Sequence, residues 1–389
     1  MASSGAGQVE QLRRRNTARV LGVLRADGPT TRTDLSRRTG LAKATVGSIV
    51  TDLESAGLAA ETGELTTGRG RPGRTVALTG ADVLGLGFEV NVDYVATVSL
   101  DVGGTVRHAE TVPVGDETPW DVVTQVAAER ADDVRAAGGR IAGCAVAVPG
   151  LVASDRRTVR WAPNLQWRDR DLAASIDAAT GVAGTVVDND ANCAAVGESS
   201  HGQASGVDSA LYVTGTVGIG AGWIVDGAVV RGHGGFAGEV GHLPLGDPAA
   251  RCGCGRTGCW EASVGLRAAL AATGVTEAST PWASAERIAA AAPDTPAVAE
   301  GIALIGRHVG HGVAALAGFA DPEVVVLGGY FVPLAPWLVP AAEEVIGERL
   351  TFADLHRPEL LLSPLGLQAA AIGAAEHALD PVLTGSLLP

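Results

Sequence analysis

A cluster of cysteines carries the clearest chemical signal in the sequence. Three of the five cysteines lie within eight residues, in Cys252-Gly-Cys254-Gly-Arg-Thr-Gly-Cys259, where the glycines permit a tight knuckle. His242, ten residues upstream, is the nearest imidazole that can complete a tetrahedron. Three thiolates and one imidazole form a closed structural zinc set, and unligated buried thiols explain this spacing poorly. We therefore expect a structural Zn2+ held by His242, Cys252, Cys254 and Cys259.

Carboxylates and amides form a second polar group. Asp188-Asn189-Asp190 and Glu239 fall at expected loops, and Glu261 follows the last cysteine by two residues. The hydroxyls of a polyhydroxylated ligand need several acceptors and a few donors, which these side chains supply together with His242. On spacing alone, an ordinary set of scattered surface charges remains the alternative, because any acidic protein offers such groups.

From about residue 82 onward the pattern alternates strands with helices, and the polar groups fall where strands end. Strands that end in glycine or carboxylate turns and feed helices indicate α/β lobes with ligand groups at the strand ends. We expect strands at 84–89, 94–100, 105–112, 143–148, 185–187, 210–214 and 324–327, and helices at 120–137 and from about 191.

An uncharged stretch, Val324–Ala342, is long enough to suggest a membrane span. Gly328-Gly329 and prolines at positions 333, 336 and 340 interrupt it, so we expect a buried strand followed by a turn, and no membrane segment. The first twenty residues lack the apolar core of a secretory signal, which predicts a cytoplasmic protein with reduced thiols.

Charge is divided unevenly along the 389 residues. The formal net charge is −14, which alone argues against nucleic acid as a partner. Residues 1–74 carry 12 Lys and Arg against 7 Asp and Glu, whereas residues 75–389 carry 17 against 36. A basic head on an acidic body is the asymmetry expected of a tethered nucleic-acid-binding module.

The first sixty residues read as three short amphipathic helices, which end at Gly28-Pro29, Gly40 and Gly57. Segments 58–61 and 74–78 can pair as strands around a tip rich in glycine and arginine. Helices joined by short turns and followed by such a hairpin are typical of a winged helix-turn-helix.

The third of these helices has small and donor side chains opposite its apolar stripe, which fits a major groove. Arginines at the tip can reach phosphates or a narrow minor groove. The alternative, a helical protein-binding module with a solvated loop, makes little use of alternating glycine and arginine. The expected DNA-contacting residues are Lys43, Ala44, Thr45, Ser48, Arg69, Arg71 and Arg74.

Six short segments of the body form a recognisable set: AVPGLV (147–152), PNLQW (163–167), VDNDANCAAVGE (187–198), GGFAGEVGH (234–242), CGCGRTGCWE (252–261) and GLQAAAIGAA (366–375). Together they resemble the ROK family of sugar kinases and transcriptional regulators, and the pairing of GEVGH with CxCGxxGCxE is highly specific. The preceding winged helix-turn-helix is similar to that of the family's repressor branch.

The resemblance implies an α/β body with an actin/hexokinase-like fold, in which two lobes close on a sugar. It also implies an all-α/winged helix-turn-helix DNA-binding domain at residues 1–80 and a ROK body at 81–389. The small lobe would comprise about 81–190 plus the C-terminal helix, and the large lobe about 191–370.

By position, the resemblance assigns sugar contacts to Asn189, Asp190, Glu239, His242 and Glu261, with Asp190 at the place of the kinases' catalytic base. The four zinc residues match the family's ligands. His242 therefore falls in both groups, and an imidazole can serve both through its two nitrogens.

The turn that holds ATP phosphates in the family's kinases differs in this chain. Those kinases have Asp-x-Gly-Gly-Thr, whose glycines let backbone N–H groups approach an anion, but residues 88–93 read Phe-Glu-Val-Asn-Val-Asp. A second phosphate-contacting turn is also altered, at 214–218. The literal string Asp101-Val-Gly-Gly-Thr105 comes one strand too late and is expected to be a hairpin turn. We therefore expect no catalytic residue and no kinase activity.

The sequence thus predicts a sugar-responsive transcriptional repressor, whose body binds a sugar effector without phosphorylating it. We expect it to bind double-stranded DNA at an inverted-repeat operator, as a homodimer or tetramer. The alternative is an active ATP-dependent, glucokinase-like sugar kinase with an appended DNA-binding head.

Overall fold

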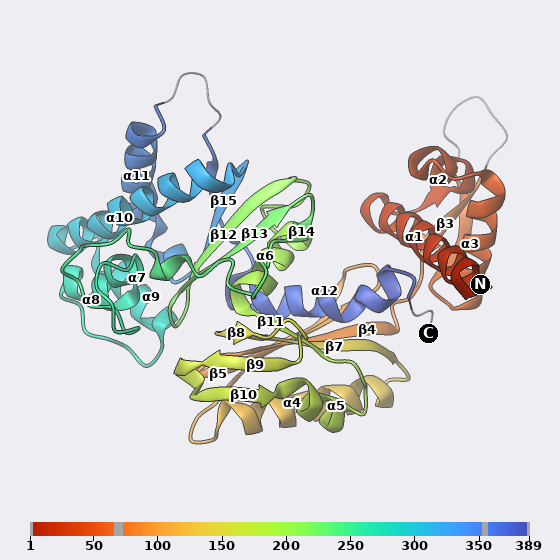
Figure 1. The fold of residues 1–389 in the computed structure, drawn as a ribbon, viewed down its shortest axis with the longest axis horizontal. Coiled ribbons are helices and arrows are strands. Elements are labelled where there is room, and N and C mark those ends of the chain that lie inside the picture. The colour runs from red at the N-terminus through yellow and green to blue at the C-terminus, as the bar shows by residue number, and fades with distance from the viewer. Residues whose placement is uncertain (1–2, 66–72, 352–356, 387–389) are drawn as a thin grey trace.

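A computed structural model describes residues 3–65, 73–351 and 357–386 of the chain (Figure 1). Two five-stranded sheets lie on either side of a central helix pair, α6 (Asp190–His201) and α12 (Ala369–Leu383), and a smaller N-terminal group of elements stands to one side. The expected two-lobed α/β body behind a winged helix-turn-helix is confirmed by this arrangement.

Three helices and a small sheet of order β1-β3-β2 form the head. The second helix begins where the Thr31 hydroxyl accepts the Asp34 N–H at 3.1 Å, and it ends at Gly40 with φ 70°. The two-residue strand β1 is not apparent from the sequence, because it is too short for any alternation to register. The head elements are α1 (Ser3–Asp27), β1 (Thr30–Thr31), α2 (Arg32–Thr39), α3 (Lys43–Ser55), β2 (Ala59–Leu65) and β3 (Gly73–Leu78).

The first sheet of the body has the order β11-β7-β4-β5-β6, with β4, β7 and β11 parallel. Helices α4 and α5 lie on one face of it and α12 on the other (Figure 1). The expected strands are confirmed to within three residues. The elements are β4 (Val83–Val90), β5 (Tyr94–Asp101), β6 (Val106–Pro113), α4 (Pro119–Ala136), β7 (Arg140–Val148), β8 (Leu151–Val152), β9 (Thr158–Ala162), η1 (Pro163–Leu165), β10 (Trp167–Asp171), α5 (Leu172–Thr180) and β11 (Val186–Asn189).

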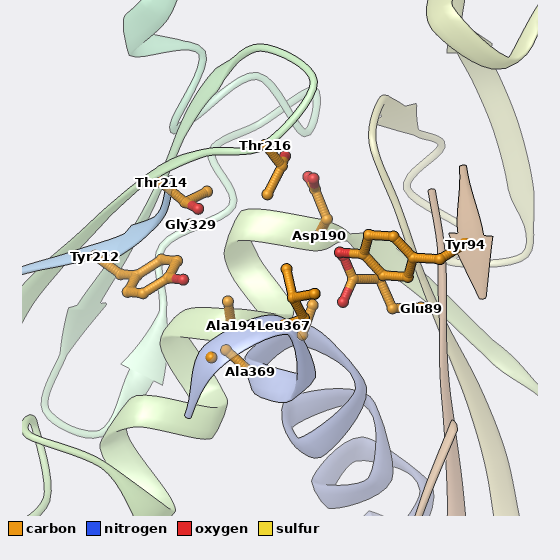
Figure 2. Close-up of a pocket in the computed structure, with 12 residues that line it drawn as sticks. Glu89, Tyr94, Asp190, Ala194, Tyr212, Thr214, Thr216, Gly329, Leu367 and Ala369 are labelled. Atoms are coloured by element: carbon orange, nitrogen blue, oxygen red, sulfur yellow. The ribbon is translucent and has the colours of Figure 1, made fainter. Parts of the chain in front are cut away.

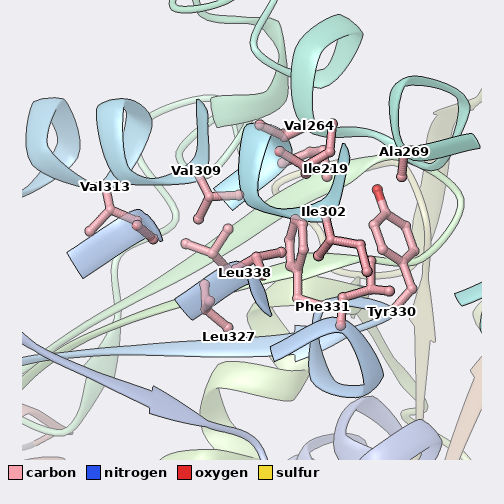
Figure 3. Packing of buried hydrophobic residues seen from close by; sticks show 14 of the residues in the cluster. Ile219, Val264, Ala269, Ile302, Val309, Val313, Leu327, Tyr330, Phe331 and Leu338 are labelled. Carbon is pink, nitrogen blue, oxygen red and sulfur yellow. The ribbon is translucent and has the colours of Figure 1, made fainter. Parts of the chain in front are cut away.

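The second sheet has the order β14-β13-β12-β15-β16. Its outer face packs on α10 and α11, and their apolar side chains form the largest core of this lobe (Figure 3). The elements are β12 (Ser209–Gly215), β13 (Ile219–Val225), β14 (Ala228–Val229), η2 (Val240–His242), α7 (Glu261–Val264), α8 (Leu266–Thr273), α9 (Pro281–Ala291), α10 (Pro296–Ala320), β15 (Val324–Gly329), α11 (Phe331–Arg349), β16 (Glu359–Leu362) and η3 (Gly366–Gln368).

The expected buried strand is confirmed as β15, but the expectation that the following prolines interrupt regular structure is wrong. Helix α11 begins at Phe331 and continues through Pro336 and Pro340. Each proline removes one helical N–H donor, but the buried side chains of Phe331, Leu334 and Leu338 hold the helix against the core and offset this cost.

Helix α10 is, within the described residues, the one helix with the length and mean hydropathy, 1.2, of a membrane span. No feature of the sequence had pointed to this segment. Of the window that meets these criteria, 56% is buried inside the protein, as in the core helix of a globular fold. Its contacts with α11 include Gly306, where an added Cβ would lie 2.3 Å from the Leu338 carbonyl oxygen.

Helices α6 and α12 meet backbone to backbone. A Cβ added at Gly373 would lie 1.7 Å from the Cys193 carbonyl oxygen, and one at Gly197 would lie 2.5 Å from the Ala369 carbonyl oxygen. On its other side α12 touches the first sheet, because a Cβ at Gly87 would come within 2.1 Å of the Ala371 carbonyl oxygen. These positions require glycine, since main-chain atoms cannot yield as a flexible side chain can.

The replacement Gly373→Ala tests this packing. We expect it to lower the free energy of unfolding by about 1–3 kcal/mol or more, because the new methyl group overlaps a carbonyl oxygen. Urea unfolding followed by circular dichroism measures the change. In the control Gly318→Ala, on α10, the added Cβ meets nothing within 4 Å, so stability should stay equal or rise. Equal stability of both variants would contradict the close packing.

Candidate functional site

One cleft brings together the five side chains expected to contact a sugar. It has a volume of about 320 Å³ and lies where β11, the loop before η2 and α7 approach one another. Trp161 and Asn164 line the same cleft but had not been assigned a role from the sequence. Asn164 belongs to the PNLQW segment, and Trp161 precedes that segment by two residues. The juxtaposition is as expected, whereas the role of these side chains as sugar contacts stays a prediction. The five residues are Asn189, Asp190, Glu239, His242 and Glu261.

Asn189 and Asp190 lie where β11 ends and α6 begins. The Asn189 side-chain oxygen accepts the Asn192 N–H at 3.2 Å as the helix cap, and its amide donates to the Gly150 carbonyl at 3.2 Å. Burial raises the pKa of the Asp190 carboxyl to about 7; the nearby Glu239 carboxylate adds to this, and an N–H from Ala191 opposes it. A carboxyl group with this pKa can accept a proton from a hydroxyl near neutral pH.

Glu239 reaches the cleft from the loop before η2, and Glu261 reaches it from the first position of α7. Burial raises the pKa of Glu239, the neighbouring His242 lowers it, and Glu261 raises it further. Glu261 accepts the Ile219 N–H at 3.0 Å, and a Cβ at Gly218 would lie only 2.6 Å from its Oε2 atom. The altered turn at 214–218 therefore contacts the cleft carboxylate directly.

The four expected zinc ligands are also brought together. Their donor atoms all lie within 4.8 Å of one another. The Sγ atoms of Cys254 and Cys259 are 3.6 Å apart, and the Sγ atom of Cys252 is 3.8 Å from Nδ1 of His242. Thiolates bound to one tetrahedral zinc lie about 3.8 Å apart, since each Zn–S bond is about 2.3 Å, so the residues fit this ion.

The pKa values of the thiols differ. A hydrogen bond from Arg256 lowers the pKa of Cys254 to about 6, whereas burial raises that of Cys252 to about 12. Nδ1 of His242 faces the thiols, which leaves Nε2 for the cleft that the same ring lines. Trp260, fully buried, anchors the loop by donating its indole N–H to the His308 carbonyl at 2.9 Å.

A second pocket adjoins the cleft on the other side of Asp190 (Figure 2). Tyr94 and Tyr212 enter it from opposite sheets, and the Tyr94 hydroxyl donates to Glu89 at 2.9 Å. Burial, reinforced by the charge on Asp190, raises the pKa of Glu89 to about 8. The buried carboxyl group of Glu89 and the partly buried one of Asp190 therefore line the same pocket.

The turn at 91–93, expected to replace the kinases' phosphate-binding turn, makes its own hydrogen bonds. The Asn91 N–H donates to the Tyr94 carbonyl at 2.8 Å, and the Val92 N–H donates to the Asn91 side-chain oxygen at 2.7 Å. Two donors that an anion would need are thus engaged within the turn. The string Asp101–Thr105 is confirmed as the β5–β6 turn, closed by the Gly104 N–H on the Asp101 carbonyl at 2.9 Å.

Asp188, which the sequence groups with Asn189 and Asp190, is almost fully buried and is not among the residues that line the cleft. Arg156 contacts its Oδ2 atom at 2.8 Å and Arg231 at 2.6 Å, and Nε2 of His377 lies 3.6 Å away. Although burial opposes ionisation, the two arginines lower the pKa of Asp188. Its partners come from distant segments, so no local spacing indicates the network.

The expected DNA-contacting residues divide into two sets. In α3, Lys43, Ala44 and Ser48 are exposed and Thr45 is half-buried, opposite the buried apolar stripe. Arg74 is exposed and pairs with Glu61 at 2.9 Å. The two arginines at the tip, Arg69 and Arg71, lie outside the described residues.

Comparison with known proteins covers both parts of the chain. Residues 13–70 match the MarR family. The chain is 28% identical to a protein named xylose repressor from Bacillus subtilis, over 92% of this chain and 93% of that protein. A crystal structure described as a ROK family transcriptional regulator, homologous to the Mlc protein of E. coli, is 28% identical and covers 97% of this chain and 98% of its own, with a TM-score of 0.80.

A kinase structure is similar to the body. The ROK family glucokinase from Streptomyces griseus, in complex with glucose and AMPPNP, is 26% identical over 76% of this chain and 99% of its own, with a TM-score of 0.64. Residues 86–380 match the ROK family itself. Because this match spans most of the 389 residues and carries both the cleft and the cysteine cluster, the chain belongs to the ROK family.

Proposed function

We propose that this protein is a sugar-responsive transcriptional regulator, whose head binds double-stranded DNA and whose body binds a sugar without phosphorylating it. One observation supports this most strongly. The similarity to the xylose repressor extends over 92% of the chain, head included, whereas the glucokinase aligns with 76% of it. A kinase body with a DNA-binding head is the composition of a regulator.

The head in this proposal is residues 1–80, and the effector-binding body is residues 81–389. A homodimer or tetramer in the cytoplasm would present two copies of α3 to half-sites about 34 Å apart, and hence to an inverted-repeat operator. A bound sugar acts as an effector only to the extent that it binds two arrangements of the protein with different affinity.

The absence of phosphoryl transfer is supported by the turn at 91–93. Its N–H groups donate within the turn, and Asp93 adds a carboxylate to the turn that would have to hold a triphosphate. The kinase alternative is supported by Asp190, whose pKa of about 7 suits a general base. Asp190 without a bound phosphoryl donor has nothing to transfer.

Sugar binding is tested by a thermal-shift screen of about fifty sugars, among them D-xylose, D-glucose and N-acetylglucosamine. A ligand that binds only the folded state at a hundred times its Kd stabilises the protein by about 2.7 kcal/mol, so a true effector raises Tm. Glu261→Gln should weaken its binding roughly tenfold or more, because a charged hydrogen-bond partner is lost. The exposed Glu344→Gln is the matched control.

Two results would contradict this prediction. One is that none of these sugars raises Tm. The other is ATP-dependent phosphorylation of a sugar that disappears in Asp190→Asn, which would favour the kinase alternative.

DNA contact is tested with the fragment that the protein selects from genomic DNA. Lys43→Ala, and Arg71→Ala at the tip, should each weaken binding by about 1–3 kcal/mol, and should make its salt dependence less steep if they touch phosphates. Fluorescence anisotropy at several salt concentrations measures both quantities. Arg168→Ala removes an exposed charge from the body and should change neither. Unchanged affinity in both head variants would show that neither α3 nor the tip that carries Arg71 contacts DNA.

Structural zinc is tested by elemental analysis. We expect one zinc per chain in the wild type and none in Cys254→Ser, because the tetrahedral set loses one thiolate. Sugar affinity should fall as well, since Glu261 follows Cys259 by two residues. Cys144→Ala, in the core of the first sheet, should keep its zinc. Zinc or sugar affinity retained in Cys254→Ser would separate the cysteine cluster from the cleft.

A further inference from the structure

The turn Asp101–Thr105 has no part in the proposed sugar or DNA sites, yet it contacts the head. At Gly104, where φ is 85°, an added Cβ would lie 2.8 Å from Nη2 of Arg25 and 3.3 Å from Cε1 of His201. Arg25 belongs to α1 of the head, and His201 ends α6 of the body. Absence of a side chain at Gly104 therefore lets three separate parts of the chain meet.

A buried acid joins these parts. Arg25 donates two hydrogen bonds to Glu376 on α12, at 2.7 Å and 2.6 Å, and Nε2 of His201 contacts the same carboxylate. The Glu376 side chain is 7% exposed and that of Arg25 is 19% exposed. Although burial opposes ionisation, His201 and Arg25 lower the pKa of Glu376 to about 2, so the acid is charged at neutral pH. We call Arg25, His201, Glu376 and the turn 101–105 the joint.

The joint borders an apolar cluster that the head and body share. Val20, Leu21 and Leu24 of α1 belong to the same buried group as Leu100 of β5 and Leu379 of α12. Apolar contacts tolerate small sliding movements, but a two-pronged arginine–carboxylate pair is directional. A buried charge left without its partner is also costly, so the pair opposes separation of the head from α12.

Two routes connect the joint with the cleft. Helix α6 begins at Asp190 in the cleft and ends at His201 in the joint, about 16 Å away at about 1.5 Å per residue. On α12, the residue after Glu376 is His377, which lies 3.6 Å from Asp188, and Asp188 directly precedes the cleft residue Asn189. Cleft and joint thus share the same two helices.

The two helices belong to different lobes. A Cβ at Gly222 of β13 would lie 2.4 Å from the Ala191 carbonyl oxygen, so α6 is tied to the second sheet. A Cβ at Gly85 of β4 would lie 2.6 Å from the Ala375 carbonyl oxygen, so α12 is tied to the first. His201 comes one helical turn after Gly197, where the helices touch. A rotation of the lobes about that contact therefore displaces His201 relative to Glu376.

From this arrangement we propose that Glu376 is a positioning residue, through which the relative arrangement of the two lobes sets the position of the DNA-binding head. The inference rests on the proposed function, since it names the contact that would carry the sugar signal to DNA. Glu376 touches neither ligand. Its carboxylate binds both Arg25 and His201, so the position of His201 affects the position in which Glu376 holds Arg25.

Amide hydrogen exchange on the full chain without ligand tests the joint itself. Glu376→Gln should raise exchange at least tenfold in the C-terminal half of α1, while α3 and β11 exchange as in the wild type. Asp380→Asn is the matched control, because its carboxylate is on the same helix but 54% exposed, and it should leave α1 unchanged. If Glu376→Gln does not fold, Arg25→Gln is used instead, because it removes the same ion pair by changing the residue on α1.

Two exchange results would overturn the proposal: unchanged exchange in α1, or faster exchange throughout the chain, which would make Glu376 a stabilising residue only. A second readout is the Kd for DNA, measured with and without a sugar. The sugar used is D-xylose or D-glucose, whichever raises Tm. The sugar should change the wild-type Kd for DNA at least tenfold and that of Glu376→Gln less than twofold, with the same Tm rise in both.

A tenfold sugar effect retained in Glu376→Gln would also overturn the proposal. If neither sugar alters DNA binding by the wild type, the sugar-responsive function fails for these ligands. The exchange of α1 still decides whether Glu376 positions the head, so the two failures are distinguishable.

Discussion

The crossing of α6 and α12 is the contact on which both lobes depend. Neither helix has a side chain at Gly197 or Gly373, so main chain touches main chain and no layer of side chains absorbs movement. On their outer sides, α6 packs closely against the second sheet at Gly222, and α12 packs closely against the first sheet at Gly87. The cleft residues at the start of α6 and the acid on α12 therefore take their positions from one rigid contact.

Electrostatics divide the molecule in the same way as the fold does. The basic residues concentrate in the head, whereas the cleft and its neighbouring pocket gather Glu89, Asp190 and Glu239, whose pKa values burial raises. Carboxyl groups with raised pKa values can both donate and accept hydrogen bonds near neutral pH, which suits the hydroxyls of a neutral polyhydroxylated ligand. The proposed separation of DNA contact from sugar contact follows the same division.

Much of the fold and of the candidate site follows from local sequence. The sequence pattern located seven strands of the body within three residues, although it did not indicate β8, β9, β10, β13, β14 or β16. The spacing of Cys252, Cys254 and Cys259 indicated a cluster that the structure assembles with His242. The resemblance to a family predicted that Asn189 and Glu239 lie at one site, and both line the same cleft although about fifty residues separate them.

What the sequence did not reveal depends on partners that are distant in the chain. Helix α11 tolerates Pro336 and Pro340 only because a buried core holds it, and proline by itself predicts a break. The pair formed by Arg25 and Glu376 spans 351 positions, and no local pattern announces it. Asp188 was visible as part of a motif, but its arginine partners were not.

The placement of α12 also has a consequence for the order in which the protein is completed. The strands of the first sheet are synthesised early, yet the helix that covers one of their faces is the last helix described in the chain. Until Ala369–Leu383 has left the ribosome, Gly85 and Gly87 face no partner and α1 has no acid to hold Arg25. The head can therefore dock through Arg25 and Glu376 only after α12 has been synthesised.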